Sequence, residues 1–481
     1  MEERKGFGSN FGFLMAAIGS AVGLGNIWGF PNKMGANGGF TFLILYLMLA
    51  VFCGVIVMIG ELALGRKTGH GAIGAYRILS KKFKWLGWLG VLSAFLILGF
   101  YCALGGYCLK YVTLNVGNLF HAGFGTGTLD GAGVFDALMA NQGECVIYGL
   151  IFVAITMVIV MGGVGGGIEK VCSVGMPALF VMLVICIIRS CTLEGAVEGL
   201  KYMFVPGWAL ANGVIKEAPN FFSVVSTAGG QMFFSLSLGM AAMITYGSYL
   251  DKKENLQKNA IIIVVMDTLV ALMAGLCVIP GRFALDPTGN LGGPSLLFVT
   301  MQNVFDRMGS VGPIFGIMFY LLVVFAAVSS SISLLEAVVA HFVDKAREQG
   351  KGDKRKAYSV LAGIAAGILC VIVCLDSLGN AGISPADILG MRGTMEKLPT
   401  WSADWLDFFD CIAEGILMPL GALLMSIMYG WEIGPEVVHA EATREGQSFG
   451  AYDWFKICIK YITPLAMLLV LYGQIKEFFF V

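Results

Sequence analysis

Long apolar stretches separated by short polar segments make up most of the chain. Eleven of these stretches reach about 20 residues, the length that an α-helix needs to cross a bilayer. The polar segments between them carry glycine, proline and charged residues. We therefore expect an all-α polytopic membrane protein of about eleven transmembrane helices. The predicted spans are residues 10–36, 40–65, 86–114, 143–162, 168–190, 220–249, 257–281, 310–343, 356–376, 404–430 and 453–477.

The composition agrees with a membrane location. Charged residues are 13% of the chain, against about 25% in typical soluble domains, and hydrophobic residues are 57% with a mean hydropathy of +0.80. A net charge of −1 argues against a nucleic-acid partner. The 12 cysteines form no CxxC pattern and the 4 histidines are scattered, so we expect no cysteine-based metal site and no enzyme.

The basic residues predict the orientation. If the N-terminus is cytoplasmic, 21 of the 31 Lys and Arg residues fall on the inner side, as the positive-inside rule requires. Eleven crossings then leave the C-terminus outside. We expect a multi-pass protein of the inner (plasma) membrane, with the lipid bilayer as a partner and an oligomeric state that the sequence leaves open.

Two spans contain sequences that disfavour a continuous helix. The first reads GSAVGLGN at residues 19–26, and the sixth reads SLSLG at residues 235–239. Glycine costs about 1 kcal/mol in a helix interior relative to alanine, and backbone groups freed inside a bilayer are tolerated where they line a polar site. Close helix packing is the alternative role for any single glycine. Paired breaks at matching places in two halves favour a transporter site between inverted repeats.

Five motifs, in order along the chain, resemble the neurotransmitter:sodium symporter family, whose leucine-transporter fold has such paired broken helices. The motifs are residues 19–26 followed by Phe30 and Pro31, residues 38–40 (GGF), residues 61–66 (ELALGR), residues 231–239 (QMFFSLSLG) with 244–249 (ITYGSY), and residues 325–332 (FAAVSSSI). The resemblance covers essentially the whole chain. The chain looks most like bacterial members that carry tyrosine and other hydrophobic amino acids.

The resemblance implies one transporter domain over residues 1–481 with a 5+5 inverted repeat and discontinuous helices 1 and 6. The first repeat spans about 10–190, the second about 220–430, and an extra helix about 453–477. The implied function is sodium-coupled import of hydrophobic or aromatic L-amino acids by alternating access, without chloride. A transporter of another small zwitterion is the alternative, and a channel or receptor is a weaker one because no filter loop is visible.

The resemblance also implies two Na⁺ sites built from oxygen ligands. The first site would use the Ala21 carbonyl, Asn26, Ser235, Asp267 and the substrate carboxylate. The second would use the carbonyls of Gly19, Val22 and Ala326 and the hydroxyls of Ser329 and Ser330. The alternative for the serines is a hydrogen bond to a preceding carbonyl of their own helix.

A zwitterionic substrate fits the same region by resemblance. Its carboxylate would meet the N–H groups of Leu24 and Gly25 and the Tyr101 hydroxyl, and its ammonium would meet carbonyls of Ala21, Phe234 and Ser235. Gly23 stands where monoamine transporters of the family carry Asp, which favours an amino acid. The side-chain pocket would comprise Ile97, Tyr101, Phe234, Ser237, Met240, Ser330 and Leu334. Simple packing is the alternative role for Met240.

Gating residues carry over as well. Arg4 and Asp344 match the cytoplasmic ion pair, with Phe7, Ser248 and Tyr249 around it. Phe234 and Tyr101 would form the outer lid, and Asp410 matches the acidic half of the outer gate. Gly167 and Pro177 match a pair that lets helix 5 unwind, for which a static proline kink is the alternative.

Some positions depart from the family pattern. Gly29 replaces the arginine that usually pairs with the outer acid, so Asp410 has no obvious partner in the sequence. Asp267 replaces the usual asparagine of the first sodium site, and Ala271 replaces a serine ligand of chloride. Glu414 lies inside span ten, where an acid is functional by default and needs a partner or a proton.

Overall fold

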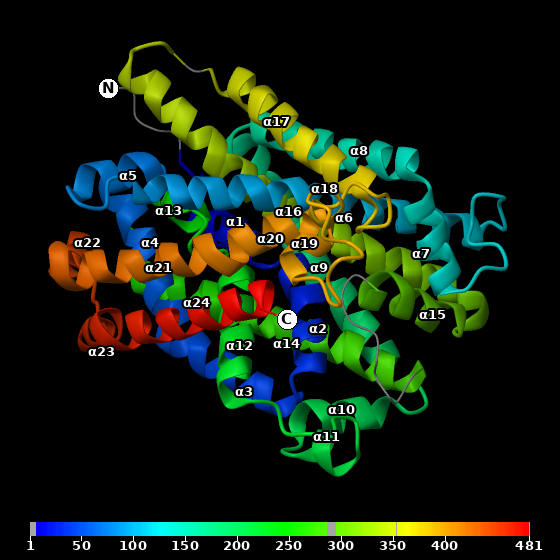
Figure 1. Ribbon diagram of the computed structural model, residues 1–481. Helices are drawn as coiled ribbons and strands as arrows, with labels where there is room; N and C mark the ends of the chain where they lie inside the picture. The colour runs from blue at the N-terminus through cyan, green and yellow to red at the C-terminus, as the bar shows by residue number, and fades with distance from the viewer. Residues whose placement is uncertain (1–5, 286–294, 353, 481) are drawn as a thin grey trace.

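The structure is a computed structural model that describes residues 6–285, 295–352 and 354–480. Within these ranges the chain forms helices and no strand (Figure 1). The predicted all-α fold is therefore confirmed. Arg4, which was assigned to the cytoplasmic ion pair, lies outside the described residues.

Nine helical stretches of the described chain have the length and apolar character needed to cross a membrane, and each coincides with a predicted span. They are Phe40–Thr68, Leu86–Leu119, Gln142–Met161, Val164–Cys191, Leu256–Leu285, Gly309–Glu348, Arg355–Asp376, Trp405–Glu432 and Tyr452–Phe479. The first and sixth predicted spans are the broken ones. The total of eleven crossings and the inverted repeat stay predictions.

Several of these stretches combine α-helix with short π-helical or 3-10 turns, labelled η. Their elements are α3 (Phe40–Leu49), η2 (Ala50–Gly54) and α4 (Val55–Thr68); α6 (Leu86–Leu119); α8 (Gln142–Met161); η3 (Val164–Ile168) and α9 (Glu169–Cys191); α14 (Leu256–Leu285); η5 (Gly309–Val311) and α16 (Gly312–Glu348); α17 (Arg355–Asp376); α20 (Trp405–Asp410), η6 (Cys411–Leu417), α21 (Met418–Ile427) and η7 (Met428–Glu432); and α23 (Tyr452–Ile457), η9 (Cys458–Ile462) and α24 (Thr463–Phe479). The shorter connecting elements are α5 (Ala72–Leu79), α7 (Gly131–Ala140), α10 (Ala196–Phe204), α11 (Trp208–Ala211), η4 (Leu296–Thr300), α15 (Met301–Asp306), α18 (Pro385–Ile388), α19 (Thr400–Ala403), α22 (Glu436–Ala442) and η8 (Arg444–Gly446).

The first predicted span is broken where the glycine-rich motif lies. Helix α1 (Asn10–Ala21) ends there, and the chain continues through η1 (Gly25–Gly29) into α2 (Phe30–Ala36), at an angle of 47° to α1. The sixth span divides into α12 (Phe221–Ser235) and α13 (Ala242–Gly247). Both predicted breaks are therefore present.

The broken helices lie in the interior of the bundle. Helix α1 packs on α9, α14 and α16, and α16 runs along much of α6. Helix α17 lies beside α8, and α21 lies beside α24 at the other edge (Figure 1). The close approach of α6 to α8 depends on glycine, because a Cβ on Gly106 would lie 2.5 Å from the Gly149 nitrogen. Packing through small residues is common between membrane helices.

Candidate functional site

The two breaks meet, and polar side chains hold them together. The Ser237 hydroxyl, in the loop between α12 and α13, donates a hydrogen bond of 2.8 Å to the Ser20 carbonyl near the end of α1. Ser237, Gly239 and Ala241 have φ values of 54°, 76° and 64°, a region that costs a non-glycine residue about 1–3 kcal/mol. Glu61 of α4 helps to hold this loop, because its Oε1 accepts a bond of 2.7 Å from the Gly239 N–H.

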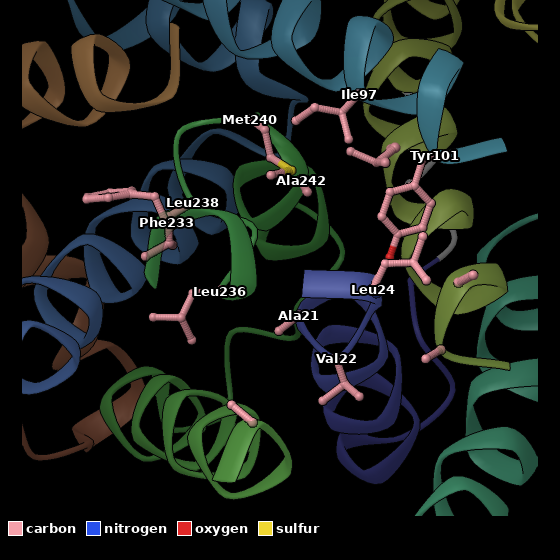
Figure 2. Packing of buried hydrophobic residues seen from close by; sticks show 14 of the residues in the cluster. Ala21, Val22, Leu24, Ile97, Tyr101, Phe233, Leu236, Leu238, Met240 and Ala242 are labelled. Atoms are coloured by element: carbon pink, nitrogen blue, oxygen red, sulfur yellow. Dashed lines mark hydrogen bonds between the residues drawn. The ribbon is translucent and has the colours of Figure 1, made fainter. Parts of the chain in front are cut away.

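A small cavity of about 20 Å³ lies between the breaks, α6 and α16, room for about one water molecule. Its lining residues are Ser20, Ala21, Gly23, Gly25, Ile97, Tyr101, Phe234, Ser237, Met240, Ser330 and Leu334. All seven residues predicted for the side-chain pocket are among them. Figure 2 shows Met240 and Ile97 next to each other, with the Tyr101 hydroxyl directed at Leu24.

The cavity has a polar end and an apolar end. At the polar end the Leu24 N–H donates to the Tyr101 hydroxyl at 2.7 Å. At the apolar end Ile97 and Met240 are buried, with 1% and 2% of their surfaces exposed. Leu24 and Ser235, predicted with this group, are not among the lining residues, and Ser235 belongs to the cluster around Asp267. The lining therefore divides into a polar part and an apolar part.

Gly23 leaves the polar end open. A Cβ at this position would lie 2.2 Å from the Tyr101 hydroxyl oxygen and 2.4 Å from Ser330 Oγ. Gly25 is equally confined, with its Cβ position 2.8 Å from the Phe234 ring. A side chain at residue 23 therefore has no room while Tyr101 and Ser330 keep these positions.

Three residues predicted for the first cation site are hydrogen-bonded to one another. Asn26 donates from Nδ2 to Asp267 Oδ1 at 2.7 Å, and the Ser235 hydroxyl donates to Asp267 Oδ2 at 2.9 Å. Tyr46 completes the shell with a longer bond of 3.4 Å to the same oxygen. All four side chains are fully buried. This set of oxygens, which includes a carboxylate, suits a hard cation such as Na⁺.

The residues predicted for the second cation site also come together, where α1 passes α16. The Ser330 hydroxyl lies 3.3 Å from the Gly19 carbonyl oxygen and 3.4 Å from that of Val22. Ser329 instead donates to the Ala326 carbonyl of its own helix at 3.0 Å, which is the alternative noted for these serines. Carbonyl and hydroxyl oxygens are therefore gathered here, without a carboxylate among the five predicted residues.

We call the side on which α1 begins the N-terminal side. Phe7 packs there edge-on against Phe13, Tyr246 and Tyr249. The hydroxyl of Ser248 donates to the Thr245 carbonyl at 2.5 Å.

Asp344 lies on the same side and accepts a bond of 2.8 Å from the Gly71 N–H. Its predicted partner, Arg4, is outside the described residues, so the predicted ion pair stays a prediction.

An ion pair that the sequence analysis missed lies beside Tyr249. Arg355 of α17 contacts Glu336 of α16 at 2.5 Å, and the Tyr249 hydroxyl donates to the other Glu336 oxygen at 2.5 Å. Glu336 is fully buried. An acid inside an apolar span was the available signal, because such an acid needs a partner.

The start of the fifth span is irregular, as its glycines suggest. Gly163 has a φ of 77°, and Gly167 lies in the π-helical turn η3, where a Cβ would come within 2.0 Å of the Ile159 carbonyl oxygen. Pro177 is accommodated inside the continuous helix α9. Glu169, which follows η3, accepts a bond of 2.7 Å from the Gly8 N–H. It thereby connects this turn to the start of α1.

On the side where α2 ends, Lys33 forms an ion pair with Glu414. This pair supplies the partner that the sequence analysis could not name for Glu414. Asp410, one turn before Glu414, is within electrostatic range of Lys33. Gly29 itself has no space for a side chain, because its Cβ position lies 2.8 Å from Gln231 Oε1.

Comparisons with known proteins agree with this architecture. The sequence model of the Sodium:neurotransmitter symporter family matches residues 4–119 and 139–479. The sodium-dependent transporter YhdH of Bacillus subtilis is 34% identical over 473 residues, covering 96% of both chains. A sodium-dependent transporter of Haemophilus influenzae is 29% identical and covers 98% of both chains. The crystal structure of MhsT in complex with L-phenylalanine superimposes with a TM-score of 0.84 at 34% identity, covering 98% of this chain and 100% of that one.

The Glu336–Arg355 pair gives a first prediction. Replacing Arg355 by Gln should destabilise the protein by about 3–5 kcal/mol, because it leaves a buried carboxylate without its counter-charge. The double variant Glu336→Gln with Arg355→Gln should regain most of that loss. Thermal unfolding in detergent measures both, with the exposed neighbour Lys354→Gln as the control for loss of a positive charge. An Arg355→Gln protein as stable as wild type would contradict the structural role of the pair.

Proposed function

The chain belongs to the sodium:neurotransmitter symporter family, and we propose that it imports hydrophobic and aromatic L-amino acids by sodium-coupled symport. The observation that carries this proposal is that both helix breaks, the cavity and the oxygen-rich clusters meet in one place. Ser330 of α16 contacts the Ser20 carbonyl near the end of α1, and Asp267 of α14 contacts Asn26 in η1, just after the break. Substrate and cations would therefore bind to one shared segment of backbone.

The polar end of the cavity supports a zwitterionic substrate. η1 begins at Gly25, and the positive end of its helix dipole favours a carboxylate. Tyr101 would donate its hydroxyl proton to that carboxylate, and the Leu24 N–H, which donates to the Tyr101 oxygen in the structure, would turn to the carboxylate. Gly23 also supports an amino acid rather than a monoamine as the substrate, because an acidic side chain that could bind a monoamine has no room there.

The apolar end supports a hydrophobic or aromatic side chain. Ile97, Met240 and Leu334 line it and offer no charge to a Lys or Asp side chain, whose burial would be costly. The present cavity is too small for an amino acid, so side chains must move on binding. Met240 is suited to this because a thioether side chain adapts its shape at low energetic cost.

Two sodium ions are proposed as co-substrates. The first would lie between Asn26, Ser235 and Asp267, with the Ala21 carbonyl and the substrate carboxylate as further ligands. The second would replace the hydrogen bonds of Ser330 and Ser329 with direct coordination by their hydroxyls and by nearby carbonyls. We propose that neither requires chloride, since Asp267 supplies a fixed negative charge and Ala271 lacks a hydroxyl.

Alternating access gives the two sides of the protein distinct roles. We propose that the N-terminal side is cytoplasmic and the C-terminus external, in a plasma-membrane protein. The cluster around Phe7, Tyr249 and Glu336 then closes the inner path. Phe234 and Tyr101 form the lid towards the outside. Unwinding between Gly167 and Pro177 would move Glu169 away from the start of α1 and admit water to the second sodium site.

Sodium should be required for tight amino-acid binding. The substrate carboxylate completes the first sodium site in this proposal, so each ligand strengthens the other, by about 5–150-fold for a typical coupling. Thermal shift of the purified protein with each of the twenty amino acids, in Na⁺ and in choline, measures this coupling. Equal shifts in both salts would contradict sodium coupling, and a preference for Asp, Lys or a monoamine would contradict the substrate class.

Met240 should set the size limit of the substrate. Met240→Phe should weaken binding of L-tryptophan more than that of L-leucine, because overpacking costs about 1–3 kcal/mol and the larger ligand meets it first. Competition binding in Na⁺ measures the ratio of the two affinities. Met48→Phe is a matched control, since Met48 is 53% exposed. Equal losses for both amino acids would remove Met240 from the pocket.

Transport should be independent of chloride because of Asp267. One full charge about 4 Å from a cation is worth about 4 kcal/mol at an effective dielectric of about 20, enough to stand in for a bound anion. The double variant Asp267→Asn with Ala271→Ser should become chloride-dependent, whereas Asp267→Asn alone should lose uptake in either salt. Uptake into proteoliposomes in chloride and in gluconate measures this. Chloride dependence of the native protein would overturn the proposal.

A further inference from the structure

The side opposite the N-terminal side carries an unusual group of charges. Lys33, at the end of the broken first helix, forms an ion pair with Glu414 across to η6. The Lys33 side chain is 24% exposed and that of Glu414 only 4%. The pair also lies over α12, because a Cβ on Gly230 would be 3.2 Å from Glu414 Oε1. Phe234, the proposed lid, follows one turn later on α12.

Two more carboxylates lie close enough to the Lys33 ammonium group to interact with it electrostatically. Asp410 and Glu477 are both within electrostatic range of Lys33. Asp410 also faces Glu414 and Asp407, and its Oδ1 is buried without a hydrogen-bond partner among the described atoms. Glu477 is different, because it lies at the exposed surface and accepts a bond of 3.5 Å from the Thr227 hydroxyl.

The charges do not balance when every group is ionised. Lys33 offsets one negative charge, and Glu414 is the carboxylate in contact with it. Glu477 lies at the exposed surface, where water can hydrate its carboxylate. Asp410 then has a like charge one helical turn away and no contact with a cation, an arrangement in which one of two neighbouring carboxyls normally holds a proton. A protonated Asp410 would also become a hydrogen-bond donor.

We propose that Lys33, Glu414 and Asp410 form the outer gate of this transporter and that closure of the gate takes up one proton at the Asp410 carboxylate. The proposal rests on the proposed function and orientation. In the open state, α2 and η6 separate, water hydrates the three groups, and Asp410 ionises. On closure, an O–H bond forms at Asp410 with a proton from the external solution, and no other bond is made or broken.

Proton binding and closure of the gate are linked, so the pH changes the balance between the closed and the open state in one direction. Because the closed state binds one proton more than the open state, lowering the external pH favours closure and raising it favours opening. A substrate retained by the closed gate should therefore bind more tightly at low pH. For one linked proton the affinity can change by up to about tenfold per pH unit between the two titration points.

Two measurements on the full chain test the proposal, with L-phenylalanine as the probe in saturating Na⁺. The first is the affinity of L-phenylalanine between pH 5.5 and 8.5. We expect it to fall about tenfold or more as pH rises in wild type and to be nearly independent of pH in Asp410→Asn. Glu477→Gln, which removes the exposed acid of the same cluster, should keep the wild-type dependence.

The second measurement counts protons directly with a pH indicator in weakly buffered solution as L-phenylalanine binds. Wild type should take up about one proton and Asp410→Asn none. Wild-type binding without proton uptake would overturn the proposal even if Asp410→Asn fails to fold, and so would an unchanged pH dependence in Asp410→Asn. Failure of L-phenylalanine to bind in Na⁺ at any pH would instead count against the proposed substrate class.

Discussion

Every backbone group freed where α1 and α12 break lies inside a bundle of apolar helices and must find a partner within the protein. The Gln231 side chain meets this need for the Gly25 carbonyl with a bond of 2.7 Å. Asn26 accepts from the Gly23 N–H at 3.0 Å, and Glu61 accepts from the loop of the sixth span. The polar residues of an otherwise apolar interior therefore lie where the two helices break. The cavity and the residues around it are found at the same place.

The same requirement explains why the breaks can respond to ligands. The Ser330 hydroxyl lies near the carbonyls of Gly19, Ser20 and Val22, but it has one proton and can fully satisfy one of them at a time. A cation accepts several oxygens at once, so a bound Na⁺ would satisfy carbonyls that the serine leaves weakly bonded. Binding of the cation and stabilisation of the break would then be one event, which is the physical basis for coupling between sodium and substrate.

Much of this arrangement could be predicted from the sequence because it depends on local patterns. Span length, the glycine-rich break of the first helix and the SLSLG segment of the sixth are visible along the chain. The pairs Lys33–Glu414 and Arg355–Glu336 could not be found in this way. Each joins helices that are distant in sequence, and Lys33 lies one turn after Gly29, the position where the family resemblance leads one to expect the arginine. A three-dimensional arrangement is needed to see that Gln231 occupies the space beside Gly29.

The use of charged pairs at both ends of the proposed path has an energetic reason. An apolar seal of the same area would be stable when closed and costly to expose to water, so a gate made in that way would tend to stay shut. A buried ion pair behaves differently, because the attraction between its charges roughly cancels the cost of removing them from water. Opening returns both charges to water, and the free energies of the closed and open states stay similar. At the N-terminal side, Arg355 and Glu336 balance each other. At the opposite side one lysine faces several acids, so the balance between open and closed depends there on the protons that the solution supplies.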